Sequence, residues 1–152
     1  MVNRLEVAWT LAVVALISGV SVYSTILLYQ IDALPADPNE YVTVYGHQWY
    51  WEFCYQNGTC YNSQYNAATN TVTGGALWAT PGAVVQINVT GVDVIHSFNI
   101  PGLGVRIDAI PGRVNQFAFT VPDVPVGTQY LIQCTEYCGT LHGTMRSFLV
   151  VV

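Results

Sequence analysis

Hydrophobic positions along the chain follow two different patterns. Residues 7–31 form one continuous run that is rich in apolar side chains and carries no charge. As an α-helix this run would be about 37 Å long, enough to cross a hydrocarbon core of about 30 Å with some tilt. It exceeds the apolar core of a cleaved signal peptide, which is usually about 7–15 residues. We therefore predict a transmembrane helix within residues 1–31, with Trp9 and Tyr29 as interfacial anchors.

After a proline-containing linker over residues 32–40, the pattern changes to short apolar stretches typical of strands. Alternation with polar residues marks two of them, Val85-Ile87-Val89 and Phe117-Phe119-Val121. Further apolar stretches cover residues 41–55, 130–134 and 147–152. Residue pairs that favour turns separate the stretches, at Asn57-Gly58, Pro81-Gly82, Pro101-Gly102 and Pro111-Gly112. The pattern predicts one mainly β domain over residues 41–152, a sandwich or a barrel, without a further long helix.

Composition and charge exclude two functional classes. Charged residues make up 9% of the chain, against about 25% in ordinary soluble domains. The net charge is −5, with no Lys and four Arg, which excludes nucleic acid as a partner because phosphate binding needs clustered cations. A hydrophobic content of 52% excludes a disordered chain. Arg4 before the apolar run predicts an inner N-terminus and an outer C-terminal domain, and two N-x-T sequons agree with this orientation.

Metal-ligating side chains concentrate near the C-terminus. Cys134, Cys138, His142 and Met145 fall within 12 residues, and His96 lies 38 residues before Cys134. Thiolate, thioether and imidazole ligands favour copper. A mononuclear electron-transfer copper site needs one Cys, two His and a weak Met, so the second thiol is one more than such a site uses. Two thiolates can instead bridge two copper ions, each with one His and one weaker ligand, either Met145 or a carbonyl.

Three other interpretations remain open from the spacing alone. A closed zinc site can use the two thiols and the two imidazoles, although it leaves Met145 without a role. Such a site would make the chain a membrane-anchored β module with a structural or binding function. A Cys134–Cys138 disulfide is compatible with an oxidising compartment. The last alternative is chance clustering.

Four motifs in the same order closely resemble subunit II of the haem–copper cytochrome c oxidases, which carries the dinuclear copper A centre. They cover residues 46–52, 93–98, 107–116 and 134–145. The resemblance implies a cupredoxin-like Greek-key β-barrel or sandwich, here with one N-terminal transmembrane helix. It implies copper ligation by the side chains of His96, Cys134, Cys138, His142 and Met145, and by the backbone carbonyl of Glu136. It also implies that the Glu136 carboxylate helps to bind a magnesium ion at the contact with subunit I.

The resemblance further implies an electron-transfer function. Copper A, with two copper ions, accepts electrons from cytochrome c or a similar soluble carrier such as a blue copper protein. The electrons then pass to haem in subunit I, where oxygen is reduced to water with proton pumping. The chain is thus expected to be a subunit of an oxidoreductase and translocase of the respiratory chain, bound to subunit I and further small membrane subunits. Its expected location is the plasma membrane, single-pass, with the β domain on the periplasmic face.

An aromatic-rich stretch over residues 41–55 has two interpretations. Aromatic residues favour strands, so an edge or core strand explains the stretch without a function. The resemblance implies that Trp49 lies on the donor-facing surface and receives the electron. His47 nearby is interpreted as a surface or core histidine, because the copper ligands are already complete.

Two further groups of residues lie outside the copper ligands. Cys54 and Cys60 flank the Asn57-Gly58 turn, and on the two arms of a hairpin with a three-residue loop they would face each other and can form a disulfide. The resemblance places Arg106, Asp108 and Arg113 near subunit I, whereas ordinary surface charges are the simpler explanation.

The chain also departs from the family, and related enzymes remain as alternatives. Many members have a two-helix hairpin, and a separate small helix can replace the missing one. All copper ligands are present, which favours a soluble donor over a quinol, and the acidic net charge suits a positively charged carrier. The copper A domain of nitrous oxide reductase ends a longer soluble chain, which the predicted anchor disfavours. Nitric oxide reductases with a copper A subunit stay open, because the partner chain decides the reaction.

Overall fold

The computed structural model describes residues 3–66, 68–69 and 71–152, and the chain divides into two compact units, Met1–Ala33 and Leu34–Val152. The first unit contains helix α1 (Arg4–Ile31), which Asn3 caps by accepting a hydrogen bond from the backbone N–H of Leu5 at 3.1 Å. The helix is long and apolar enough to cross a membrane, and none of its residues is buried inside the protein. The apolar N-terminal helix expected from the sequence is confirmed.

Two hydroxyl groups within α1 are satisfied by the helix itself. Thr10 donates to the carbonyl of Glu6 at 2.7 Å, and Thr25 donates to the carbonyl of Ser21 at 2.8 Å. These bonds to the preceding turn give both hydroxyl protons an acceptor within the helix.

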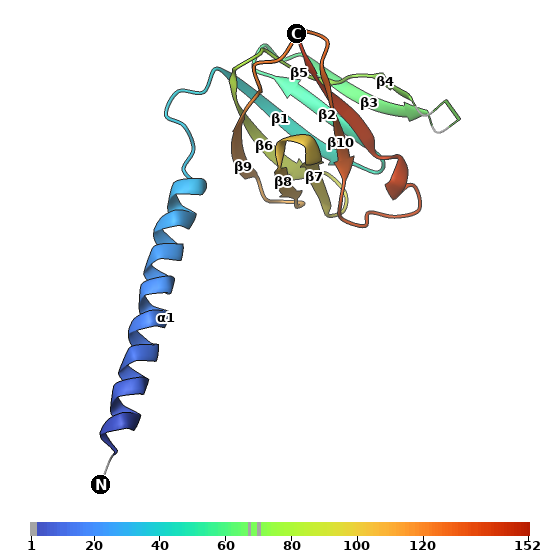
Figure 1. Ribbon diagram of the computed structural model, residues 1–152. Coiled ribbons are helices and arrows are strands. Elements are labelled where there is room, and N and C mark those ends of the chain that lie inside the picture. The colour runs from blue at the N-terminus through green and yellow to red at the C-terminus, as the bar shows by residue number, and fades with distance from the viewer. Residues whose placement is uncertain (1–2, 67, 70) are drawn as a thin grey trace. The chain divides into compact units, whose positions relative to one another are not determined.

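The second unit is built from two β-sheets (Figure 1). The first sheet has the strand order β4-β3-β2-β1-β6-β9. Its strands are β1 (Glu40–His47), β2 (Tyr50–Tyr55), β3 (Cys60–Asn66), β4 (Thr71–Gly74), β6 (Val84–Gly91) and β9 (Asn115–Thr120). The second sheet has the order β5-β11-β10-β7-β8. Its strands are β5 (Leu77–Ala79), β7 (His96–Ile100), β8 (Val105–Ala109), β10 (Gln129–Cys134) and β11 (Arg146–Val151). Neighbouring strands are antiparallel, except for the parallel pairs β1–β6 and β5–β11.

Alternating side chains from both sheets form a single core. In β6 the buried positions are Val85, Ile87 and Val89, as the alternation predicts. Burying each large apolar side chain contributes about 1.5–3 kcal/mol, so this alternation fixes which face of the strand turns inward. The core residues that are fully buried include Val44, Trp51 and Phe53 from the first sheet and Phe98, Ile132 and Leu149 from the second. The predicted mainly β fold is confirmed.

The connections agree with the sequence in part. Gly58, Gly82 and Gly112 have φ values of 81°, 73° and 76°, as expected for three of the predicted turns. The expected turn at Pro101-Gly102 takes the form of a short 3-10 helix, η1 (Pro101–Leu103), in which the N–H of Gly104 donates to the carbonyl of Pro101 at 3.2 Å. The apolar stretch over residues 41–55 is two strands, β1 and β2, rather than one.

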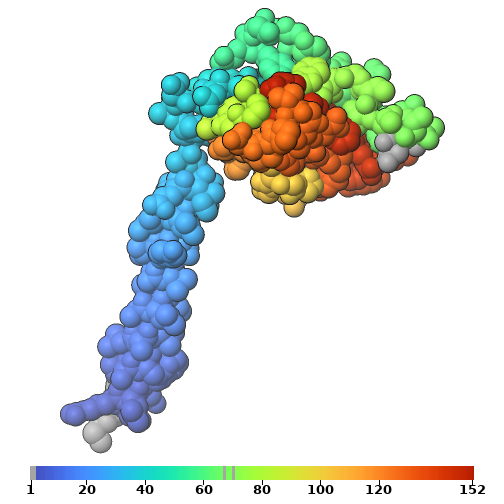
Figure 2. All heavy atoms as spheres, turned by 45° about the horizontal axis from the view of Figure 1, so that its top comes forward, coloured from blue at the N-terminus to red at the C-terminus, as the bar shows by residue number. Residues whose placement is uncertain are grey.

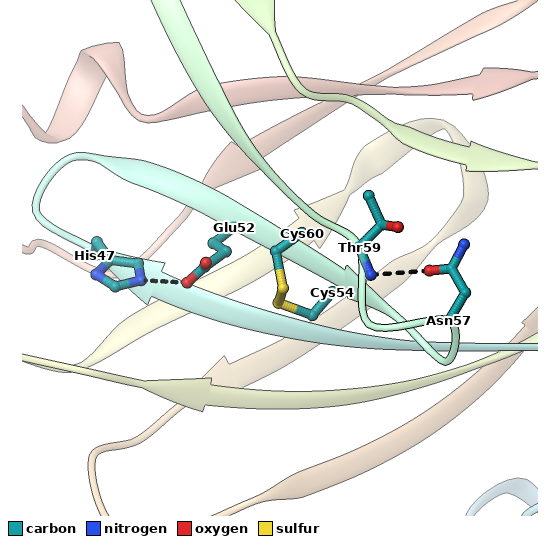
Figure 3. Close-up of a disulfide and its surroundings, with 6 residues drawn as sticks. All are labelled: His47, Glu52, Cys54, Asn57, Thr59 and Cys60. Carbon is teal, nitrogen blue, oxygen red and sulfur yellow. Dashed lines mark hydrogen bonds and ion pairs between the residues drawn. A yellow bond between two sulfur atoms is a disulfide. The ribbon is translucent and has the colours of Figure 1, made fainter.

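The hairpin of β2 and β3 has a three-residue loop. Tyr55 donates its backbone N–H to the carbonyl of Thr59 at 2.9 Å, and Asn57 accepts a hydrogen bond from the N–H of Thr59 at 2.9 Å (Figure 3). This register places Cys54 directly opposite Cys60, and a disulfide joins them.

Strand β3 also lies beside β11, although the two are far apart in the sequence (Figures 1 and 2). Arg146 at the start of β11 lies over the ring of Tyr65, 5.2 Å from its centroid. Ser147 donates a hydrogen bond to the carbonyl of Gly75 at 3.3 Å. The β2–β3 hairpin is thereby held next to the loop between β10 and β11.

Candidate metal centre

The strand pairing brings the predicted ligands together at one end of the sandwich. Cys134 ends β10 and Met145 precedes β11, and the two strands are antiparallel neighbours. The backbone N–H of Cys134 donates to the carbonyl of Met145 at 3.1 Å, which closes the base of the loop over residues 135–144. His96 begins β7, the other neighbour of β10. The pairing of β7 with β10 therefore supplies the imidazole that is distant in sequence.

Cys134 is the centre of one half of the site. Its Sγ lies 4.0 Å from Nδ1 of His96 and 3.2 Å from the carbonyl oxygen of Glu136. His96 is fully buried, whereas the side chain of Glu136 is exposed. The Cys134 thiol, the His96 imidazole and the Glu136 carbonyl thus converge and could bind the same ion.

Cys138 is the centre of the other half. Its Sγ lies 3.5 Å from Nδ1 of His142 and 3.8 Å from Sδ of Met145. Met145 is fully buried, and His142, at the start of the 3-10 helix η2 (His142–Thr144), is half-buried. The sulfur atoms of Cys134 and Cys138 are 3.8 Å apart, so the two halves share a pair of neighbouring thiols.

The two thiols and the two imidazoles do not form one compact set of four donor atoms. Tetrahedral zinc draws its four ligand atoms to roughly 3.3–3.8 Å from one another. Among the described residues, the ligand atoms of His96, Cys134 and Cys138 all lie within 4.8 Å of one another, and this group does not extend to His142.

Cys134 and Cys138 are free thiols, so the alternative of a disulfide between them is wrong.

Asp93 orients the His96 ring. Its carboxylate accepts hydrogen bonds from Nε2 of His96 at 2.7 Å and from the backbone N–H groups of Gln48 at 2.7 Å and Val94 at 2.6 Å. Burial opposes ionisation of Asp93, but these hydrogen bonds outweigh it and hold the pKa of the carboxyl below its usual value. With Nε2 occupied, Nδ1 is the nitrogen left to bind a metal.

The two thiols differ in acidity. Burial, and then the charge of neighbouring Cys134, raise the pKa of Cys138 to about 12. Burial also opposes ionisation of Cys134, but hydrogen bonds from His96 and the backbone lower the pKa of this thiol. Burial of His96 favours its neutral form, yet its bonds to Cys134 and Asp93 raise its pKa. Metal binding must therefore displace protons from the site, above all the proton of the Cys138 thiol.

Two glycines allow the close packing around the site. A Cβ on Gly46 would lie 2.9 Å from Cδ2 of His96, so the bare backbone of β1 makes room for the imidazole. Gly139 has a φ of 120°, and its Cβ would lie 3.1 Å from Nε2 of Gln48 and 3.3 Å from the indole of Trp49.

Trp49 is in direct contact with the loop over residues 135–144. The carbonyl of Cys138 accepts hydrogen bonds from Nε1 of Trp49 at 3.2 Å and from Nε2 of Gln48 at 2.7 Å. Trp49 itself is half-buried, and its indole N–H reaches the backbone of a predicted ligand. The sequence indicated Trp49 only through the family resemblance, and it gave no sign of Gln48.

Four further residues considered in the sequence lie away from the thiols: His47, Arg106, Asp108 and Arg113. His47 pairs with Glu52 at 3.0 Å (Figure 3) and stacks on Tyr50, which agrees with its interpretation as a surface or core histidine. Arg106 donates to Oγ of Ser97 at 3.3 Å, one residue from His96 in sequence. Asp108 and Arg113 are exposed.

The fold is shared with proteins of known type. Residues 41–152 match the family described as cytochrome c oxidase subunit II, periplasmic domain. Cytochrome c oxidase subunit 2 of Metridium senile is 37% identical over 155 residues, which cover 93% of this chain and 60% of that protein. The chain thus spans about 60% of the length of the first curated relatives it matches.

Two solved structures superpose on the β domain. The periplasmic domain of subunit II of cytochrome oxidase from Bradyrhizobium japonicum has a TM-score of 0.71 and 30% identity, covering 78% of this chain and 88% of that chain. A mixed disulfide intermediate between a thioredoxin-like protein and subunit II of cytochrome c oxidase has a TM-score of 0.66 and 31% identity, covering 79% and 85%.

Proposed function

Because the chain belongs to the cytochrome c oxidase subunit II family, we propose that it holds a dinuclear copper A centre and is the subunit through which electrons enter a haem–copper terminal oxidase. The observation that carries this proposal is the division of the donor atoms into two sets around a pair of thiols 3.8 Å apart. The proposed ligands are His96, Cys134, the Glu136 carbonyl, Cys138, His142 and Met145.

Two copper ions held by these residues would supply a site that takes up and releases one electron. The protein contributes rigidity and exclusion of water. Cys134, Cys138, His96 and Met145 are each at most 7% exposed. Asp93 fixes the tautomer and orientation of His96. A site that keeps the same ligand positions in both redox states needs little rearrangement when the electron arrives.

Trp49 is proposed as the residue that receives the electron from the donor. Its indole is half-buried and donates a hydrogen bond from Nε1 to the carbonyl of Cys138, one of the proposed copper ligands. The proposed donor is cytochrome c or another soluble carrier such as a blue copper protein, and the acceptor is haem in subunit I, where oxygen is reduced. The exposed carboxylate of Glu136 is proposed to share a magnesium ion with subunit I.

We also propose that α1 spans the plasma membrane once and that the β domain lies on the periplasmic face. The length and apolar composition of α1, and its lack of buried residues, support an environment of lipid and neighbouring membrane subunits. Outside the cytoplasm a reductant is needed to keep the two thiols free for the metal. The mixed disulfide of the related subunit II supports a thioredoxin-like protein in that role.

The test is a spectrum of the full chain after copper loading. We expect two copper ions per chain, a purple colour, and an EPR signal of one unpaired electron shared by two copper nuclei. A blue mononuclear species, or one zinc ion and no copper, would refute the proposal. One zinc ion and no copper would instead support the interpretation as a zinc-binding module.

A further inference from the structure

The two N-x-T sequons of the chain lie in very different places in the fold. Asn57-Gly58-Thr59 lies in the loop of the β2–β3 hairpin, and all three residues are exposed. Asn88-Val89-Thr90 lies inside strand β6. An N-x-T tripeptide on a surface loop is the acceptor sequence for N-linked sugars in proteins outside the cytoplasm. The proposed electron-transfer function uses neither tripeptide.

The side chain of Asn57 is oriented by its own tripeptide. Its Oδ1 accepts a hydrogen bond from the backbone N–H of Thr59 at 2.9 Å, and Figure 3 shows Nδ2 turned away from Thr59. Among the residues that the structure describes, none accepts a hydrogen bond from this Nδ2. Nδ2 is the atom that carries the sugar in an N-linked glycan. In the hairpin loop this atom is therefore both exposed and available.

The hairpin also leaves room for a bulky group. No atom lies within 4 Å of the position that a Cβ on Gly58 would take, so the outer side of the loop is open. The Cys54–Cys60 disulfide joins the two strands at the base of the loop and keeps the tripeptide at the surface. The six residues of β2 lie between the loop and Trp49, a separation of about 20 Å. A sugar on Asn57 would thus lie away from the proposed metal ligands.

Asn88 is held within the sheet. Strand β6 pairs with β1 on one side and with β9 on the other. Oδ1 of Asn88 accepts a hydrogen bond from Nε2 of Gln116 at 3.0 Å, and Thr90 donates its hydroxyl to the carbonyl of Ile110 at 3.2 Å. Asn88 and Thr90 are both half-buried. An enzyme cannot enclose this tripeptide without pulling the middle of β6 out of the sheet.

The surface near the hairpin lacks charge, which gives a sugar a physical role there. Residues 53–92 contain no charged side chain. Strand β4 is the edge of the first sheet, and its neighbour β3 exposes mostly polar side chains. An open edge invites pairing with another chain, and proteins often place Lys there to prevent it. The chain contains no Lys, so a hydrated sugar at Asn57 would hinder such pairing by its bulk.

We propose that Asn57 is an N-glycosylation site of the folded protein and that Asn88 is not one. The proposal goes beyond the electron-transfer function and rests only on the periplasmic location of the β domain. The sugar donor is a lipid-linked sugar phosphate. The bond between the anomeric carbon and the phosphate oxygen breaks, and a bond from this carbon to Nδ2 of Asn57 forms. Nδ2 releases one proton to a base of the transferase, the lipid phosphate leaves, and nothing is oxidised or reduced.

The test is mass analysis of the oxidase purified from its native membrane. After reduction and alkylation, chymotrypsin cleaves behind aromatic residues and separates the two sequons into the peptides 56–61 and 79–98. We expect peptide 56–61 to carry the added mass of whole sugar residues, and fragmentation should locate them on Asn57. Peptide 79–98 should have its unmodified mass.

Variants made in the same organism identify the acceptor. Thr59→Ala should abolish the added mass, whereas Thr59→Ser should keep it, because Ser retains the hydroxyl of the sequon. Both variants keep the backbone N–H that bonds to Asn57. The matched control Thr90→Ala, in the second sequon, should leave the mass of peptide 56–61 unchanged. Protease treatment of spheroplasts is carried out in parallel and should digest the β domain.

Two results would overturn the proposal while the β domain is digested from outside. One is an unmodified peptide 56–61 in the native protein, and the other is equal modification of both sequons. A β domain that resists protease until the membrane is opened would refute the periplasmic location, and this proposal with it. The copper A spectrum of the same preparation reports on the metal centre separately. An absent spectrum together with a modified Asn57 would refute only the proposed function.

Discussion

The carboxylate of Asp93 and the imidazole of His96 form a hydrogen bond of 2.7 Å, and the same carboxylate accepts the backbone N–H of Gln48. One side chain thus fixes a proposed copper ligand and also the segment that carries Trp49. The position of the Trp49 indole and the orientation of the His96 ring are therefore linked through Asp93.

Asp93→Asn should weaken copper binding. The amide holds the N–H of His96 less strongly than a carboxylate does, and loss of such an outer partner commonly lowers metal affinity about 10–100-fold. Competition with a copper chelator measures this effect. Asp123→Asn, at an exposed position far from the thiols, is the control. Equal affinities of the two variants would show that Asp93 does not act on the site.

Cys134→Ser and Cys138→Ser should each abolish the shared-electron EPR signal. Each variant removes one of two neighbouring sulfur atoms, and the remaining thiolate cannot bridge two copper ions in the same way. Met145→Leu, which nearly conserves the volume of a buried side chain, should keep the fold and change the signal more mildly. An unchanged spectrum in either Cys variant would contradict the ligand assignment.

Copper affinity should fall as the pH is lowered. The pKa of Cys138, about 12 before a metal binds, means that this thiol is protonated throughout the range from pH 5 to 8 and must lose its proton to bind. Displacing one proton changes the apparent affinity about 10-fold per pH unit, and the raised pKa of His96 adds to the competition. Chelator competition across this range gives the slope. An affinity independent of pH would show that the thiols are already ionised.

The Cys54–Cys60 disulfide should be present in the isolated protein. Alkylation without a reductant, followed by mass analysis, should modify Cys134 and Cys138 but neither Cys54 nor Cys60. Because the bond closes a short loop, the double substitution Cys54→Ala/Cys60→Ala should lower the free energy of unfolding by about 2 kcal/mol. Denaturant unfolding measures this change. Two modified thiols at 54 and 60 would contradict the disulfide.

Gly139→Ala should separate electron entry from metal binding. The new Cβ would require a strained φ of 120° and would press on Trp49 and Gln48, at a cost of about 1–3 kcal/mol in stability. Donor-driven reduction of copper A should slow, while the spectrum of the loaded site persists. Gly143→Ala, in the same loop but with nothing near its Cβ, is the matched control. Equal reduction rates in the two variants would mean that the position of Trp49 is not needed for electron transfer.

Much of the fold was predictable because its patterns are local. An uncharged run long enough for a membrane predicts α1, and alternation at Val85, Ile87 and Val89 predicts β6. Strands β3 and β4 gave no such pattern, because most of their side chains are polar and exposed. Strand β3 pairs with β2 and β4 pairs with β3, and the residues of β3 and β4 by themselves do not indicate this pairing.

The donor types of the metal site and the family of the chain could both be read from the sequence. Cys134, Cys138, His142 and Met145 lie on one loop, so their spacing already limits the metals they can bind. Tertiary structure alone decided how the donors divide between the two thiols and that Asp93 and Gly46 shape the position of His96. The physical reason is that spacing along the chain fixes only short separations, whereas contacts between β1, β7 and β10 depend on the register of the sheets and on which side chains are buried between them.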